Sequence, residues 1–314
     1  MPTALLLALL FFLPSMGFSQ VGKCLVGDCK EGYGHFQWFS GEEYLGNFQG
    51  GLRQGYGVFY WQDRRKFVGT WKKGKMNGEG LLFHPNGRLQ RGVWRANNFI
   101  KLLRPPYQLS TQHLAHGKKQ LQQLLQDRPS MQTLVQLDDP IAQWVMLQLA
   151  GSSIKTPIYW QDSTSRSFPI PSGVNAVHSY PTAKTEARVW VNPNAIAEQQ
   201  WAGLIYELHN IQNGPDFELI EKDAQQFRCT QEEYIMRYAR LEYKAAQATA
   251  QFYEDLWKPF CKSQGRSTIP QYWFYYLPPT FEEWAVSFTD KKGYPWHPYE
   301  GYYQKILQTA LKRY

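Results

Sequence analysis

The chain has 314 residues, and its 34 Lys and Arg against 26 Asp and Glu give a formal net charge of +8. It contains no P-loop, no Gly-x-Ser-x-Gly motif and no dinucleotide-binding fingerprint, so the sequence gives no support for the enzyme classes that depend on them. The positive charge is not accompanied by a nucleic-acid-binding motif, and we therefore expect no nucleic-acid partner.

The first 19 residues have the features of a secretory signal peptide. Residues 4–13 are almost wholly apolar, and Gly17 and Ser19 are small residues at the −3 and −1 positions of a cleavage site. An apolar run of about ten residues is too short to cross a bilayer, which needs about 20. We therefore expect cleavage after Ser19 and export of the mature chain.

Four cysteines follow the signal. Cys24 and Cys29 lie in the segment 20–31 and are close enough for a local disulfide, which an oxidising compartment would favour. Cys229 and Cys261 lie at the two ends of a long predicted helix, which would hold them about 40 Å apart. A disulfide requires its Cα atoms to lie within about 7 Å, so we expect no bond between Cys229 and Cys261.

A repeat of 23 residues runs through residues 32–94. Tyr44, Phe67 and Gln90 begin successive units, and each is followed two residues later by glycine. Alternating aromatic and small residues predict antiparallel hairpins, in which each glycine leaves room for a ring from the neighbouring strand. The same register repeats further glycines, which pair as Gly51 with Gly74, Gly55 with Gly78 and Gly57 with Gly80.

Stacked units are expected to bury a continuous seam of rings, because one unit cannot bury enough surface alone. The seam should include Phe48, Phe59, Trp71 and Phe83. The last unit has Asn97 at the position of the earlier turn glycines and lacks a following Gly-x-Gly, which predicts a terminal, capping repeat.

The template Tyr-x-Gly-x-Trp-x-x-Gly-x-x-x-Gly-x-Gly resembles the MORN repeat family over about residues 32–94. The resemblance implies an elongated twisted sheet that associates with proteins and, in some members, with phospholipid. It does not imply catalysis by the repeats.

The segment 32–104 contains 12 Lys and Arg and four Asp and Glu, so its net charge equals that of the whole chain. A basic sheet face could dock an anionic membrane surface or an acidic protein partner. Alternatively, cations at exposed turns protect the edges of the sheet from pairing. The residues that we assign to anionic-surface binding are Arg53, Arg64, Arg65, Lys66, Lys72, Lys73 and Lys75.

Residues 105–314 predict a mostly α-helical domain with few strands, so the fold class of the chain is α+β. At about 200 residues this region can hold its own core. Helices are expected near 110–127 and 138–150, from an N-cap at Asn194 to about Ile211, over 217–228, from a capping box at Thr230 to about Trp257, and near 280–288 and 300–312, with a strand at residues 188–191.

Two predicted helices carry acidic residues on their apolar sides. Glu242 lies within a seam of apolar residues spaced three and four apart, and a buried carboxylate needs a partner. The helix before it has Glu207 and Asn210 on one line, with His209 beside them. If these four residues meet in a cleft, Glu207 could act as a general base and the others could shape the pocket.

The arrangement of a strand, a helix with Glu-Leu-x-Asn and a later helix with an inward Glu resembles a zinc-metallopeptidase (zincin) core. In that family two histidines of His-Glu-x-x-His hold zinc while the glutamate activates water. Here Tyr206 and Asn210 stand at the two histidine positions, and neither is a good zinc ligand. The resemblance therefore implies a degenerate zincin-like domain at most, an ordinary helical pair is the simpler interpretation, and we expect no metal or cofactor.

Two functions follow from these patterns. The first is an exported MORN-repeat scaffold whose basic sheet docks an anionic surface or a protein partner and presents the helical domain. The alternative is a hydrolase-like enzyme that uses Glu207. A plain helical pair, in which Glu207 and Glu242 meet Arg237, Arg240 or Lys244, would remove the alternative.

Overall fold

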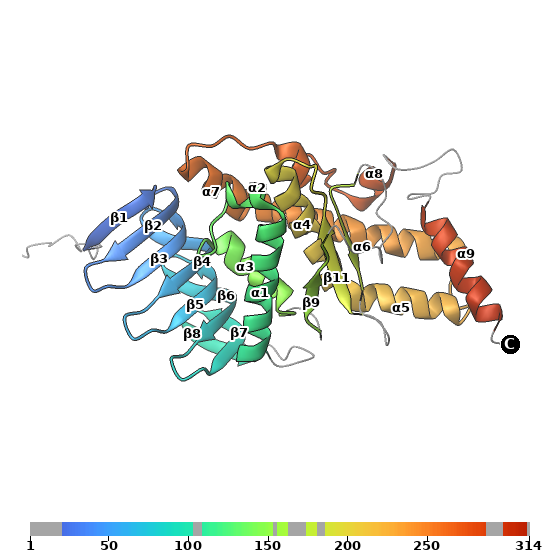
Figure 1. Ribbon diagram of the computed structural model, residues 1–314, viewed down its shortest axis with the longest axis horizontal. Helices are drawn as coiled ribbons and strands as arrows, with labels where there is room; N and C mark the ends of the chain where they lie inside the picture. Colours follow the sequence, from blue (N-terminus) through green and yellow to red (C-terminus); the bar gives the residue numbers. More distant parts are fainter. Residues whose placement is uncertain are drawn as a thin grey trace, which may run out of the picture.

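The structure is a computed structural model, and it describes residues 21–102, 109–152, 156–162, 174–180, 186–286 and 298–312. In these residues an N-terminal antiparallel sheet is followed by a mostly helical region with a small second sheet, which confirms the α+β prediction (Figure 1). The predicted signal peptide and the boundary at residues 104–105 lie outside the described residues.

The N-terminal sheet has eight strands in the described part of the chain, and each pairs with the next along the sequence. The first strand lies ahead of the repeat and extends the sheet by one hairpin. The strands are β1 (Gly22–Gly27), β2 (Gly32–Trp38), β3 (Glu43–Gln49), β4 (Leu52–Tyr60), β5 (Lys66–Lys72), β6 (Lys75–Phe83), β7 (Leu89–Arg95) and β8 (Asn98–Leu102).

A continuous row of glycines crosses this sheet, one from each of six consecutive strands. The ring of Tyr44 lies over Gly57 of the neighbouring strand, and the ring of Phe67 lies over Gly80. A Cβ atom on Gly57 would come within 2.6 Å of Tyr44 Cζ. This distance is too short for two carbon atoms, so only glycine fits there. The predicted role is confirmed for Gly57 and Gly80, and also for Gly92, which lies under Phe99. In register order the row is Gly34, Gly46, Gly57, Gly69, Gly80 and Gly92.

The rings form a buried cluster on one face of the sheet. Its members include Phe48, Phe59 and Trp71, as predicted. Phe83 was assigned to the wrong face: Leu82 joins the ring cluster, whereas Phe83 packs against the core shared with the helices. Adjacent residues of a strand point to opposite faces, so a shift of one position moves the side chain across the sheet.

The capping unit keeps the turn geometry of the earlier units. Asn97 has φ 73°, close to the 72° of Gly51 and the 78° of Gly74. Asparagine tolerates this left-handed conformation better than most residues. Its side chain also accepts a hydrogen bond from the backbone N–H of Met76, with N···O 2.8 Å, which ties the last hairpin to the one before it.

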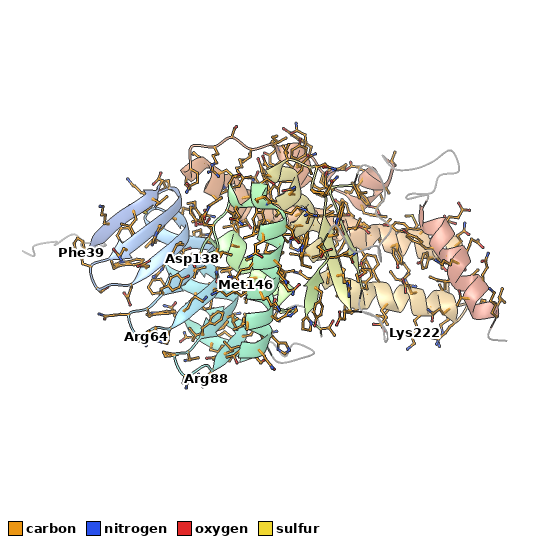
Figure 2. All side chains as sticks on the ribbon, in the orientation of Figure 1. Phe39, Arg64, Arg88, Asp138, Met146 and Lys222 are labelled. Atoms are coloured by element: carbon orange, nitrogen blue, oxygen red, sulfur yellow. A yellow bond between two sulfur atoms is a disulfide. The ribbon has the colours of Figure 1, made fainter. Side chains whose placement is uncertain are left out.

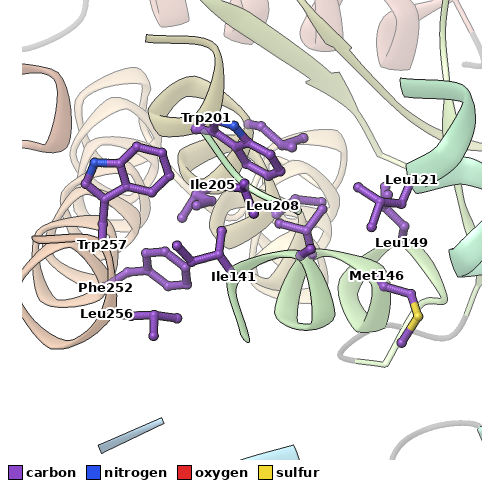
Figure 3. Packing of buried hydrophobic residues seen from close by; sticks show 14 of the residues in the cluster. Leu121, Ile141, Met146, Leu149, Trp201, Ile205, Leu208, Phe252, Leu256 and Trp257 are labelled. Atoms are coloured by element: carbon purple, nitrogen blue, oxygen red, sulfur yellow. The ribbon is translucent and has the colours of Figure 1, made fainter. Parts of the chain in front are cut away.

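The face opposite the ring cluster packs on the helical region, so the two parts share one core. The ring of Tyr33 meets that of Phe260 edge-on, with centroids 5.1 Å apart. On the helical side, side chains of α4 (Ala197–Gln212) pack beside those of α3 (Pro140–Leu149) and of the end of α6 (Gln231–Phe252) (Figure 3). The sheet contributes Tyr33, Val58, Val68 and Leu81 to this core.

The helices follow the predicted segments closely. They are α1 (Thr111–Asp127), α2 (Pro129–Gln132), α3 (Pro140–Leu149), α4 (Ala197–Gln212), α5 (Gly214–Gln225), α6 (Gln231–Phe252), α7 (Lys258–Ser263), α8 (Phe281–Val286) and α9 (Pro298–Leu311), with a π-helical turn η1 (Tyr253–Trp257) and a 3-10 turn η2 (Pro270–Trp273). The capping box is confirmed, because Thr230 Oγ1 accepts from the Glu233 N–H and the Glu233 carboxylate accepts from the Thr230 N–H.

Two predicted helix ends were wrong. The N-cap of α4 is Ile196 and not Asn194. The long helix does not stop before Pro259 but continues through η1 into α7. Proline has no N–H to bond the carbonyl four residues earlier, which belongs to Asp255, and that carbonyl instead accepts a hydrogen bond from the side chain of Asn47 on β3. The helix survives because the sheet satisfies the freed group.

A second sheet of three strands lies beside α4 (Figure 1). Its strands are β9 (Ile158–Trp160), β10 (Ala176–Ser179) and β11 (Ala187–Val191), and the last confirms the predicted strand. β10 is antiparallel to β11, and β9 is parallel to it. This places the side chains of β10 next to the polar side of α4.

The cysteines agree with the expectations. Cys24 and Cys29 form a disulfide with Cα atoms 5.9 Å apart. Cys229 and Cys261 are free and buried. The helix that separates them is longer than predicted, so the reason given for the absence of a bond is strengthened.

Replacing Gly80 with alanine tests the steric role of the glycine row. The new Cβ would come within 2.5 Å of Phe67 Cε2, and Phe67 is fully buried. We expect a loss of about 1–3 kcal/mol in the free energy of unfolding, measured by urea denaturation. Gly301→Ala is the control: no atom lies within 4 Å of its Cβ, and it should gain about 0.5–1 kcal/mol as a helix residue. An unchanged midpoint for Gly80→Ala contradicts the steric account.

Candidate functional site

Helices α4 and α6 bring three of the four predicted site residues together. Glu242 of α6 accepts hydrogen bonds from Asn210 Nδ2 (2.8 Å) and from the Tyr206 hydroxyl of α4. Its other carboxylate oxygen accepts from the hydroxyl of Tyr299 on α9, with O···O 2.9 Å. Glu207 lies about one turn before Asn210 on α4, next to its side chain, and completes the group. We call His178, Tyr206, Glu207, Asn210, Glu242 and Tyr299 the polar cluster.

His178 joins this cluster from β10. Its Nδ1 atom makes a hydrogen bond with the Glu207 carboxylate, and both side chains are 12% exposed. The ring of Tyr180 packs edge-on against the His178 ring, with centroids 4.5 Å apart. Solvent therefore reaches the His178–Glu207 pair at the edge of the cluster.

Burial sets the electrostatics of the cluster. It raises the pKa of Glu207, while the neighbouring His178 opposes this shift. Burial and the charge of Glu242 raise the pKa of Tyr206 and of Tyr299 well above the ordinary value for tyrosine. Both tyrosines consequently remain neutral hydrogen-bond donors to Glu242 at physiological pH.

His209 does not belong to the site, contrary to the expectation that it shapes the pocket. It points to the other side of α4, where its ring lies 5.0 Å from that of Trp144. There it lines a cavity of about 190 Å³ between the helices and the sheet, together with Tyr56 and Arg91. Burial lowers the pKa of His209 to about 4. Two helix positions diverge by about 200°, so His209 points to nearly the opposite side of α4 from Glu207.

The basic residues proposed as partners of the two carboxylates are engaged elsewhere. Arg237 pairs with Asp223 (2.9 Å), Arg240 with Glu282 (3.0 Å) and Lys244 with Asp216 (3.7 Å). The alternative of a plain helical pair neutralised by these cations is therefore wrong. In the described part of α4, α6 and β10, Glu207 and Glu242 meet hydroxyl, amide and imidazole groups.

No group of three or more His, Cys, Asp or Glu side chains suited to a metal ion occurs among the described residues. At the positions that correspond to the zinc histidines, Tyr206 and Asn210 donate hydrogen bonds directly to Glu242.

The structure separates the predicted basic residues of the sheet into two sets. Arg53 lies among the rings, with its guanidinium carbon 4.6 Å from the centroids of both Phe59 and Trp71, and it donates to the carbonyl of Gly74. Lys66 lies on the helical side and donates to Gln143. Burial lowers the pKa of Arg53 and of Lys66, so neither presents a free cation to a surface.

The other five lie at hairpin turns. These turns join the ends of the strands and form two opposite edges of the sheet. Lys72, Lys73 and Lys75 are exposed at the β5–β6 turn. Arg64 and Arg65 lie at the β4–β5 turn, and Figure 2 shows Arg64 at a hairpin tip. Arg65 is paired with Asp63 at 2.7 Å. The cations thus line edges and not the broad face that the sequence suggested.

Fold and surface together define a repeat-built β-sheet platform joined to a helical body. The MORN repeat family matches residues 44–64 and 67–87, so the chain carries two MORN repeats, within the segment where the glycine register predicted them. No curated protein matches the chain. Among the described residues, every helix is too short or too polar to cross a membrane.

Sequence reasoning missed His178 and Tyr299. His178 comes from a four-residue strand and Tyr299 from a helix 57 residues beyond Glu242, so neither is close to the motif in sequence. One pattern could have indicated His178: its polar ring follows two apolar residues in the short segment Ala176-Val177-His178. A period of two there would have placed it on one face of a strand.

Replacing Glu207 with glutamine tests the electrostatics of the cluster. Because its folded pKa is raised above 4.5, the carboxyl contributes stability that is present below that pH and is lost as pH rises through the folded value. We expect the free energy of unfolding of the wild type to fall relative to Glu207→Gln as pH rises above 4.5, measured by urea denaturation between pH 4 and 8.

Glu282→Gln provides the control for this profile. Its backbone hydrogen bond and Arg240 lower the pKa of Glu282, so its contribution is lost as pH falls and the sign is opposite. Parallel profiles for the wild type and Glu207→Gln would contradict a raised pKa at Glu207.

Proposed function

We propose that the protein is an exported interaction scaffold whose repeat sheet docks an anionic membrane surface through the edge at the β5–β6 turn. MORN repeats are consistent with association with proteins or membranes, and two are present. The single observation that carries the proposal is the exposed group of Lys72, Lys73 and Lys75. In the described part of the chain, no ion pair neutralises these lysines.

Exposed apolar side chains on neighbouring hairpins support a membrane as the surface. Leu52 of β4 is 45% exposed, and Phe99 and Ile100 of β8 are 39% and 51% exposed. These strands begin at turns on the same edge as the β5–β6 turn. Cations combined with apolar side chains suit the boundary between lipid headgroups and acyl chains.

The helical region covers the face of the sheet that lies opposite the ring cluster. Docking through the edge at the β5–β6 turn would therefore leave the polar cluster uncovered. A scaffold of this form would hold the helical region at the surface and present it outward. An acidic protein partner would use the same lysines, and the test below separates it from lipid.

Neutralising the three lysines together, as Lys72→Gln, Lys73→Gln and Lys75→Gln, tests membrane docking. Each lysine near an anionic surface contributes about 1 kcal/mol, so we expect the triple variant to bind phosphatidylserine vesicles at least tenfold more weakly, measured by co-sedimentation at two salt concentrations. High salt should weaken the wild type in the same direction.

The matched control changes three exposed lysines of the helical region, as Lys118→Gln, Lys119→Gln and Lys222→Gln, and should bind like the wild type. Vesicle binding that does not depend on lipid charge, on salt or on the lysines of the β5–β6 turn would contradict the membrane proposal. Export is tested separately by determining the N-terminus of the mature protein, which we expect to begin at Gln20.

A hydrolase activity at Glu207 is the second candidate, and the convergence of Glu207, Asn210 and Glu242 without a basic partner favours it. In this scheme Glu207, with His178 as its partner, would accept a proton from water. Hydrolysis of a peptide library that is lost in Glu207→Gln would support it, and activity equal in both proteins would exclude that role.

A further inference from the structure

The polar cluster has more hydrogen-bond acceptors than its neighbours satisfy. Asn210 is 1% exposed, and its Oδ1 atom has no hydrogen-bond partner among the described residues, although its Nδ2 atom donates to Glu242. A buried amide oxygen without a donor costs about 1–3 kcal/mol. The position therefore calls for a group that donates hydrogen bonds.

The cluster also carries unbalanced negative charge. Glu207 and Glu242 bear two formal negative charges, and His178 can neutralise at most one of them. Lys and Arg side chains of α6 are paired with acids outside the cluster. Tyr206 and Tyr299 donate hydrogen bonds but bring no positive charge. A missing partner would thus be a cation.

Aromatic rings pack against two members of the cluster, Tyr206 and His178. The Tyr206 ring packs on Phe274 with centroids 4.8 Å apart, and Tyr180 packs on His178. Phe274 has φ 57°, an uncommon conformation for a bulky residue, which places its ring against Tyr206. Ring faces attract cations in addition to any hydrogen bonds.

We propose that the polar cluster is a binding site for a primary ammonium group, held by Glu242 and Glu207, with Asn210 Oδ1 as a further acceptor and the rings of Tyr180, Tyr206 and Phe274 around its alkyl chain. The 12% exposure of His178 and Glu207 gives the ligand an entry point. The ammonium supplies both the donor that Asn210 lacks and the charge that balances Glu242.

An organic cation fits this site better than a metal ion. Calcium takes six to eight oxygen ligands, whereas the cluster offers only the carboxylates of Glu207 and Glu242 and the Asn210 Oδ1 atom among the described residues. An ammonium group needs few acceptors and tolerates aromatic walls. This inference is independent of membrane docking, because the cluster lies on α4, α6, β10 and α9 and not on the sheet edge.

Calorimetric titration of the full chain with butylammonium tests the proposal without any variant. Butan-1-ol is the neutral counterpart of nearly the same shape. We expect a dissociation constant in the range of about 1 mM for butylammonium and binding at least tenfold weaker for butan-1-ol. Equal affinity for the two, or no heat from butylammonium, overturns the proposal, and so does binding of calcium chloride in place of the amine.

Glu242→Gln locates the site, because it removes the charge with little change of shape. We expect butylammonium to bind about 10- to 100-fold more weakly, and Glu207→Gln to weaken it in the same direction if Glu242→Gln does not fold. Glu282→Gln, an exposed carboxylate on α8, and the triple lysine variant of the sheet are controls that should bind like the wild type. Unchanged affinity in Glu242→Gln and Glu207→Gln overturns the assignment.

Two peptides distinguish the two possible sources of the ammonium group, a lysine side chain of a protein and a free amine. A blocked Gly-Lys-Gly peptide and its norleucine analogue present the same backbone with and without the charge. Binding of the lysine peptide more tightly than butylammonium identifies a protein side chain as the source. Binding of butylammonium alone identifies a free amine, and both results support the site.

Discussion

The close approach of aromatic rings to a row of glycines is the constraint on which the sheet depends. Tyr44 and Phe67 occupy space that a side chain on Gly57 or Gly80 would need. Because the glycines are aligned across six strands, the same packing recurs from hairpin to hairpin. The rings are buried on one face without help from the helices, and this frees the other face to share a core with them.

That shared core changes how the charge of the chain is interpreted. Lys66 and Arg53 contribute to the formal charge of the segment, yet one contacts Gln143 of α3 and the other stacks on rings. A half-buried, engaged cation of this kind stabilises packing and is less free to meet an external anion. What remains for a surface is the set of cations at the turns, which is a narrower and more directional feature than net charge suggests.

Much of the fold could be predicted because its signals are local. The glycine register fixed the hairpins, and Thr230 with Glu233 fixed the start of α6. The end of that helix could not be predicted, because it depends on a bond from Asn47, which lies 208 residues from Asp255. The face of Phe83 was missed for a different reason: a period of two leaves adjacent residues equally plausible until packing decides.

The candidate site was predictable where it lies on helices and unpredictable where other elements enter. The spacing of Glu207 and Asn210 placed them on one side of α4, and the seam of α6 turned Glu242 towards them. His209 is two residues from Glu207, which turns it to nearly the opposite side of the helix. His178 arrives from a short strand and Tyr299 from the last helix, and only the tertiary arrangement brings these rings to the carboxylates.

The proline in the long helix has a mechanical consequence. From Glu242 to Asp255 the chain is helical without interruption, a span of about 20 Å, and the far end is fastened to β3 through Asn47. A tilt of the sheet against the helices would therefore carry this rod with it, and the carboxylate at its other end would shift relative to α4. Through the freed carbonyl, the orientation of the platform and the spacing of the acidic groups would change together.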